Sequence, residues 1–202
     1  MTRDEMAAFK RLVTGEASYA DRISLGFALR LAIFRQQTGN DHEVLSEIRH
    51  LEQGTVTTTK PAAQFKYAPL WPFWHKHFFS SQHLLRNIGE RWNIARGPGN
   101  NDLDAMIQQV AAEHGHDFEM WQKLITHRFI IGALEERSAA NRITGNWIIF
   151  AKHEGQNYYL DLAVHEEGSK GENAARLMKK LKLGSAVDFP FLFDDNYPPQ
   201  TP

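Results

Sequence analysis

Ten histidines are the side chains of this 202-residue chain best suited to proton transfer or metal binding near neutral pH. Two pairs are spaced as His-x-His, His75 with His77 and His114 with His116. Residues i and i+2 share a face on a strand but diverge on a helix, so only an extended His75–His77 segment offers two metal ligands. No third ligand follows at a recognised spacing. Packing and helix capping are therefore the favoured interpretation, and we predict no metal site and no cofactor.

A second group of reactive side chains follows a predicted β-hairpin. Two apolar runs, Trp147–Lys152 and Tyr158–Val164, flank a polar turn that contains Gly155. A turn at Glu154 and Gly155 sets the register of the two strands. The expected pairs are His153 with Gln156, Ala151 with Tyr158, Ile149 with Leu160, and Trp147 with Leu162.

The two faces of this hairpin differ in chemistry. The face with Trp147, Ile149 and Leu160 is apolar throughout, so we expect it to cover a core. The opposite face carries Ile148, Phe150, Lys152, Tyr159, Asp161 and His165. Same-face neighbours along one strand lie ~7 Å apart, so an acid–base pair on this face needs a residue from another element. Two interpretations stay open, a reactive site and a solvated sheet edge protected by charged residues.

Basic residues near the hairpin can bind phosphate. His127 and Arg128 lie on the preceding predicted helix, and Arg142 precedes the first strand. The last predicted helix carries Arg176, Lys179, Lys180 and Lys182. Such a cluster is typical of a solvated face near a helix C-terminus, and the alternative is a phosphate-contacting patch beside the hairpin.

Helical periodicity predicts the elements that position these residues. Three N-terminal helices are expected: one over 4–13, one capped by Ser18 and running to about 37, and one from 41 to Gly54. Residues 55–72 read as an irregular connection, and 73–79 as an aromatic cluster that belongs to the core rather than to a base-stacking platform. Further helices follow, including a long one over 117–138.

The C-terminal part is expected to contain a short helix over 172–182, ended by Gly184, and then an apolar edge segment over 187–193. Together these elements predict an α+β fold in which a helical N-terminal layer packs on a small antiparallel sheet built around the hairpin at 147–164. We expect a single domain over 1–202. It comprises a mainly helical part, 1–138, and an α/β hairpin part, 139–193.

Composition excludes several classes of function. The chain has no cysteine, which excludes disulfides, zinc–thiolate sites and cysteine nucleophiles. Its formal net charge is −1, so no overall charge draws it to nucleic acid or to an anionic membrane. It begins without a signal-peptide core, and no apolar run reaches the ~18 residues of a membrane span. We therefore expect a cytoplasmic protein without membrane contact.

The segment from His127 to His165 resembles the barnase/RelE-like nuclease superfamily, especially its phage-associated branch. It runs from a helix through a basic connection into a hairpin with histidines at its strand ends. The resemblance covers about 40 residues and implies metal-independent RNA cleavage by attack of the ribose 2′-hydroxyl. A histidine would act on the proton and basic residues would hold the phosphate. The matching positions are His127, Arg128, Lys152, Tyr159 and His165.

The sequence therefore favours two functions. The first is an intracellular, metal-independent ribonuclease, toxin-like or related to phage defence. Its catalytic residues would be the five that match, with Arg142, Lys179 and Lys180 binding the RNA. The second is a non-catalytic phage- or plasmid-type interaction protein, a regulator, inhibitor or immunity protein, which binds an inhibitor or host target. The aromatic segment at 70–79 favours it, because aromatic residues dominate protein interfaces. A metal-dependent hydrolase built on His75 and His77 is a lesser third alternative.

Overall fold

The computed structural model describes residues 1–79, 83–94, 101–140, 142–143, 145–168, 171–194 and 197. The chain forms two compact units. Unit 1 comprises Met1–Thr57, Pro61–Phe79 and Gly145–Pro202, and unit 2 comprises Thr58–Lys60 and Ser80–Thr144. The predicted α+β class is confirmed. The units differ from the predicted parts 1–138 and 139–193, because the N-terminal helices and the hairpin belong to the same unit.

Unit 1 is built on a four-stranded antiparallel sheet in the order β1-β2-β3-β4. The strands are β1 (Ala63–Gln64), β2 (Trp74–Phe78), β3 (Asn146–His153) and β4 (Gln156–Ala163). The β3–β4 hairpin and its turn at Glu154 and Gly155 were predicted, and both are confirmed. Strand β2 comes from the aromatic cluster, where consecutive bulky residues hide the alternation that marks a strand. It pairs with β3 along its whole length.

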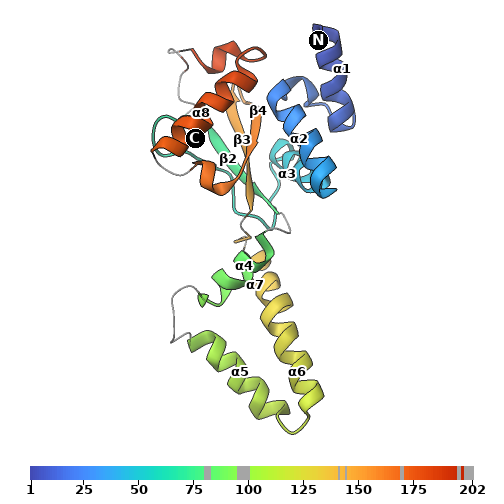
Figure 1. The fold of residues 1–202 in the computed structure, drawn as a ribbon, viewed down its shortest axis with the longest axis vertical. Helices are drawn as coiled ribbons and strands as arrows, with labels where there is room; N and C mark the ends of the chain where they lie inside the picture. The colour runs from blue at the N-terminus through green and yellow to red at the C-terminus, as the bar shows by residue number, and fades with distance from the viewer. Residues whose placement is uncertain are drawn as a thin grey trace. The chain divides into compact units, whose positions relative to one another are not determined.

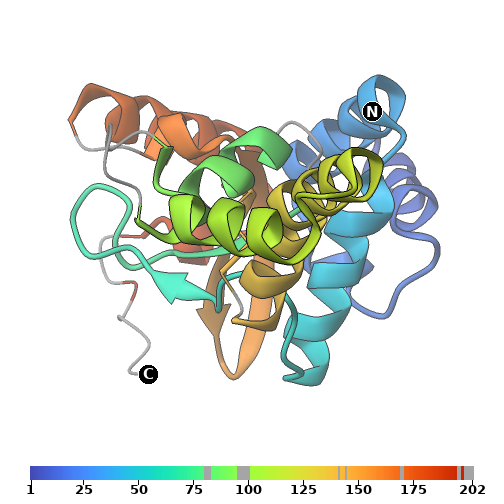
Figure 2. The same cartoon turned by 90° about the horizontal axis from the view of Figure 1, so that it is seen from below.

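Helices cover both faces of this sheet (Figure 1 and Figure 2). One side carries α1 (Arg3–Thr14), α2 (Leu25–Thr38) and α3 (Asp41–Gln53), and the other carries α8 (Glu172–Ser185). The first core joins these three helices to Ile148, Phe150 and Tyr159, and the second joins α8 to Trp147, Ile149 and Leu160. The expectation of one exposed polar face is therefore wrong. Distant helices bury that face as a second core.

A β-bulge corrects the predicted register. Ala151 pairs with Tyr158 and Phe150 with Tyr159, but Ile149 pairs with Asp161. Leu160 is thus an extra residue in β4, and the predicted pairs of Ile149 with Leu160 and Trp147 with Leu162 are wrong. Beyond the bulge the facing of β4 is shifted by one residue, which moves Leu162 into the core beneath α1–α3.

The edge of the sheet at β4 is closed by α2 and α8, which contact each other and this strand. Ser24 and Ser185 both donate hydroxyl hydrogen bonds to the Leu160 carbonyl, at 2.7 and 3.0 Å. Ser24 also caps α2, in place of the predicted Ser18. An unprotected strand edge invites pairing with other chains, so this cover keeps the sheet closed.

Close packing of α2 on α8 explains why the predicted role of Gly184 is wrong. A Cβ built on Gly26 would lie 2.8 Å from the Gly184 Cα. The two helices therefore contact each other directly through their backbones at these glycines. Gly184 therefore serves this crossing and does not end α8, which continues to Ser185. After α8 the chain forms the short 3-10 helix η6 (Pro190–Leu192) where an edge segment was expected.

Unit 2 is helical. Its elements are α4 (Leu84–Arg91), α5 (Asn101–His114), α6 (Phe118–His127), the π-helical segment η4 (Arg128–Gly132) and α7 (Ala133–Ala139). Figure 1 shows α5 and α6 as an antiparallel pair. The long helix predicted over 117–138 is confirmed, with Asp117 as its N-cap and η4 as an interruption. Trp92 donates from its indole to the Phe129 carbonyl at 2.9 Å, within that interruption.

Candidate functional site

Tyr159, one of the predicted catalytic residues, is fully buried in unit 1. Its hydroxyl donates a 2.6 Å hydrogen bond to Glu52 on α3. The same carboxylate forms a bidentate pair with Arg22, which also donates to the Asn157 carbonyl at 2.6 Å. The expected position of Tyr159 on an exposed face is therefore wrong. Its hydroxyl instead anchors β4 to the helical layer.

The charges of this cluster are balanced. Burial raises the pKa of Glu52, but hydrogen bonds from Arg22 and Tyr159 outweigh it, so the pKa lies below its ordinary value. Burial and the neighbouring carboxylate raise the pKa of Tyr159 far above the usual range. A neutral phenol bonded to an ionised carboxylate is a stable arrangement. The cluster is therefore suited to holding the fold together rather than to moving protons at neutral pH.

Asp161 forms a second buried charge cluster, at the β4 edge. It lies 3.3 Å from Arg30 on α2 and 3.6 Å from Lys180 on α8, and it accepts a 2.7 Å hydrogen bond from the Leu162 amide. Burial raises the pKa of Asp161, and the two cations only partly offset it. The charged partners of Asp161 thus come from α2 and α8, not from its own strand. The expected exposure of Asp161 is wrong.

A pocket of about 330 Å³ adjoins this cluster. It lies between η5 (His165–Gly168) and α8, and its lining residues are Glu167, Asn173, Arg176, Leu177 and Lys180. Lys180 donates to the Glu167 carboxylate at 2.9 Å, and Arg176 pairs with Glu172. Both cations are thus already balanced by carboxylates. The other predicted RNA-binding lysine, Lys179, is exposed on α8.

His165 begins η5, two residues beyond the end of β4 at Ala163. Strand parity therefore does not orient it, and the prediction that it lies on a strand face is wrong. The His165 side chain lies outside the described part of the structure. Lys152 does lie on β3, where its ammonium group sits 3.9 Å from the centre of the Trp74 ring.

His75 and His77 share one face of β2, as an extended segment requires. Their ring centres lie 5.8 Å apart, and both pack on Trp147. The Trp147 indole donates to His77 Nε2 at 3.3 Å, and His77 Nδ1 lies 3.1 Å from the carbonyl oxygen and 3.3 Å from the amide nitrogen of Gly145. Both nitrogens of His77 are thus engaged. The described residues contain no group of three potential metal ligands.

The remaining predicted site residues belong to unit 2. His127 is the exposed last residue of α6, and Arg128 begins η4 with a half-buried side chain. Arg142 is exposed, and its carbonyl accepts a 2.5 Å hydrogen bond from Arg137. The predicted site is thus divided: three residues lie in unit 2, and Lys152, Tyr159, His165, Lys179 and Lys180 lie in unit 1.

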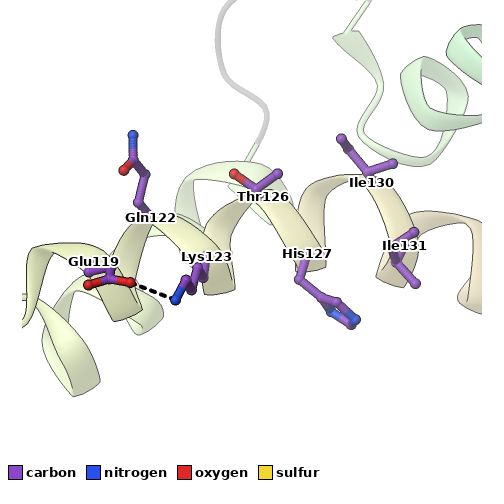
Figure 3. A pocket seen from close by; sticks show the side chains of 7 residues that line it. All are labelled: Glu119, Gln122, Lys123, Thr126, His127, Ile130 and Ile131. Carbon is purple, nitrogen blue, oxygen red and sulfur yellow. Dashed lines mark hydrogen bonds and ion pairs between the residues drawn. The ribbon is translucent and has the colours of Figure 1, made fainter.

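A groove of about 570 Å³ runs along unit 2, and we name it the α6–η4 groove. Its lining residues are Glu119, Gln122, Lys123, Thr126, His127, Ile130 and Ile131. Figure 3 shows them in two rows along one helix, with Gln122, Thr126 and Ile130 in one row. The lining is polar towards the start of α6 and apolar in η4, where Ile131 is 43% exposed. Every lining residue comes from the same continuous helix, and no other described residue lines the groove.

Sequence reasoning missed Glu52, Arg22 and Arg30, because their partners on the sheet are more than 100 residues away. The sequence nonetheless indicates that Glu52 faces the core. This residue follows Val44 and Ile48 at intervals of four, on the helix face that the core covers. A carboxylate at a core-facing position needs a buried partner. Glu47 on the same helix obeys this rule, lying 3.2 Å from the buried Lys76 of β2.

Comparison with known proteins identifies no relative: no family model, no curated protein and no solved structure matches this chain. The resemblance to the barnase/RelE-like superfamily therefore stays a prediction. Within the described residues, no helix is long and apolar enough to cross a membrane.

Proposed function

We propose that this protein is a non-catalytic interaction protein, a regulator, inhibitor or immunity protein, that binds a protein helix in the α6–η4 groove. One observation carries the proposal. Among the described residues the groove is lined by a single helix, from Glu119 to Ile131, which leaves one side open to a bound helix. A small molecule needs a pocket that encloses most of its surface, which one helix does not provide.

The side chains of the groove suit a helix. Its rows repeat every four residues, the spacing at which an apolar helix face meets a partner helix. Behind the groove, the core of unit 2 buries few side chains fully, among them Trp92, Val110 and Ala133. Large apolar residues such as Ile130 and Leu134 pack against this core but stay partly exposed. A helix bound in the groove would cover Ile130, which is also a lining residue.

Photo-crosslinking in cells tests this proposal. A benzoylphenylalanine in place of the groove residue Thr126 should form a covalent adduct with a protein helix, identified by mass spectrometry of the digest. The same residue in place of Val187, which is 82% exposed in unit 1, is the matched control and should form none. The adduct at position 126 should disappear when Ile131→Glu is added. Equal yields at the two positions would refute the proposal.

A second candidate function is metal-independent RNA cleavage at the pocket between η5 and α8. It is supported by Lys180 and Arg176 in the pocket lining and by His165 at the start of η5. In this reaction the ribose 2′-oxygen bonds to phosphorus while the bond to the 5′-oxygen breaks. His165 would accept the 2′-hydroxyl proton, and the leaving oxygen would take up a proton. The pairing of both cations with carboxylates makes this the weaker candidate.

RNA incubation in EDTA separates the two functions. Cleavage that survives EDTA and is lost in both His165→Ala and Lys180→Met would support the ribonuclease. Lys182→Met, an exposed change on the same helix, is the control and should leave cleavage unaltered. An inert protein across single-stranded and structured RNA would remove this candidate.

A further inference from the structure

The helix that lines the α6–η4 groove carries complementary charges on both sides of an apolar centre. Lys123 lies before the centre and is 71% exposed, and its pair with Glu119 at 2.7 Å is equally exposed and therefore weak. Glu135 lies beyond the centre and is also exposed, and no described residue forms an ion pair with it. The apolar centre consists of Ile130 and Ile131.

The π-helical segment η4 brings Glu135 into line with the groove. In a regular α-helix, residues seven apart lie two turns apart on the same side of the helix. A π turn contains one more residue than an α turn, so across η4 the residues on the same side are eight apart. Across η4 the residue aligned with His127 is therefore Glu135 rather than Leu134. The same row of the helix then reads Lys123, His127, Ile131 and Glu135, which is cationic at one end and anionic at the other.

We propose that the occupant of the α6–η4 groove is the same helix of a second copy of this chain, packed antiparallel about a two-fold axis near Phe129. The inference rests on the proposed function and names its partner. Lys123 and Glu135 are 12 residues apart, about 18 Å along a helix, and Phe129 is midway between them. A two-fold axis there sets Lys123 of each copy opposite Glu135 of the other. It also sets His127 opposite Ile131.

Self-complementarity favours a second copy over another protein. A two-fold axis forms both ion pairs from one sequence. It also sets the Ile131 residues of the two copies about 6 Å apart along the contact, each beside His127 of the other copy. At the small crossing angle of bundle helices, about 20°, the paired side chains stay within reach along the whole contact. The ends of the contact are charged, and its middle is formed by Ile131 and His127 of both copies.

Charge exchange tests this geometry, with the dimer dissociation constant measured by analytical ultracentrifugation of the purified chain. Lys123→Glu sets two carboxylates together at both ends of the contact, and Glu135→Lys sets two cations together there. Each variant alone should weaken the dimer by about tenfold or more. An equimolar mixture of the two variants should recover the wild-type constant, because every facing pair in the heterodimer is again opposite in charge. The double variant should recover it as well.

Lys182→Glu, an exposed change on α8, is the control and should leave the constant unaltered. A wild-type chain that stays monomeric up to about 1 mM would overturn the inference, and so would a mixture no tighter than the separate variants. Either result leaves the proposed function standing if position 126 still crosslinks to a different protein. The absence of any protein crosslinked at position 126 refutes the proposed function itself.

Discussion

In unit 1, the neighbouring residues Ile149 and Phe150 point to opposite faces of the sheet, and both are fully buried. In unit 2, the neighbouring residues Phe129 and Ile130 both stay partly exposed. The difference follows from architecture, because a sheet with helices on both faces has two enclosed cores, whereas a short helical assembly encloses only one small core. Both units also hold charged groups away from solvent: unit 1 buries Asp161 and partly buries Glu52, and unit 2 buries Arg137 beside Asn87.

This contrast separates stability from binding. Unit 1 places its reactive side chains where they hold elements together, and unit 2 leaves a row of apolar and charged side chains open. Substitutions at polar clusters should therefore be costly in unit 1, and substitutions on the groove side should affect association rather than folding.

Glu52→Ala should cause the largest loss of stability. It leaves the Arg22 cation and the Tyr159 hydroxyl without their shared acceptor, and the Arg22 side chain is only 18% exposed. Breaking such a buried pair costs about 3 kcal/mol or more. Urea unfolding followed by circular dichroism measures it. Glu154→Ala, at a carboxylate that is 82% exposed, is the control, and a loss equal to this control would show that the cluster is not structural.

Gly26→Ala should be the next most damaging change. The added methyl group would meet the backbone of Gly184, so α2 and α8 have to separate, at a cost of about 1–3 kcal/mol. In unit 2, Gly89→Ala within α4 meets nothing within 4 Å and should raise stability by up to about 1 kcal/mol through helix propensity. In thermal unfolding, Gly26→Ala should lower the melting temperature and Gly89→Ala should raise it. A stabilising Gly26→Ala would contradict the close crossing.

The two buried carboxyl groups of unit 1 should have opposite effects on the pH dependence of stability. The pKa of Asp161 is raised in the fold, so its contribution is fully present below the unfolded pKa and is lost as pH rises through the folded pKa. The pKa of Glu52 is lowered, so its contribution is lost as pH falls through the folded pKa. The melting temperature of Asp161→Asn, relative to wild type, should therefore increase from pH 4 to pH 7. A relative melting temperature that falls over this range would contradict the raised pKa.

Phe118→Ser should have the smallest effect. The Phe118 ring is 70% exposed and stacks only on Trp121, at 5.8 Å between ring centres. Surface substitutions of this kind change stability by less than about 0.5 kcal/mol. Thermal unfolding measures it, and a loss above about 2 kcal/mol would show that unit 2 has a tighter core than its exposure indicates.

Local signals were sufficient for several elements. Asp117 caps the helix after it, and the turn at Glu154 and Gly155 pairs the strands beside it, because these interactions join residues close in the sequence. The α+β class follows from the same signals. The candidate site was not predictable in this way: only His127 among the predicted catalytic residues lines the α6–η4 groove, and the π turn that aligns Glu135 with it has no recognised sequence signal.

By itself, the sequence determined where most helices lie, where the hairpin turns and which residues are able to carry charge. Only the tertiary structure decided that the polar hairpin face is a core, that Leu160 forms a bulge and that Tyr159 bonds to Glu52. The physical reason is distance along the chain. Alternation along a strand specifies two faces, but which of them is buried depends on helices more than 100 residues away. Those helices bring their own carboxylates and cations to the sheet, so a side chain that looks reactive in the sequence is enclosed in the fold.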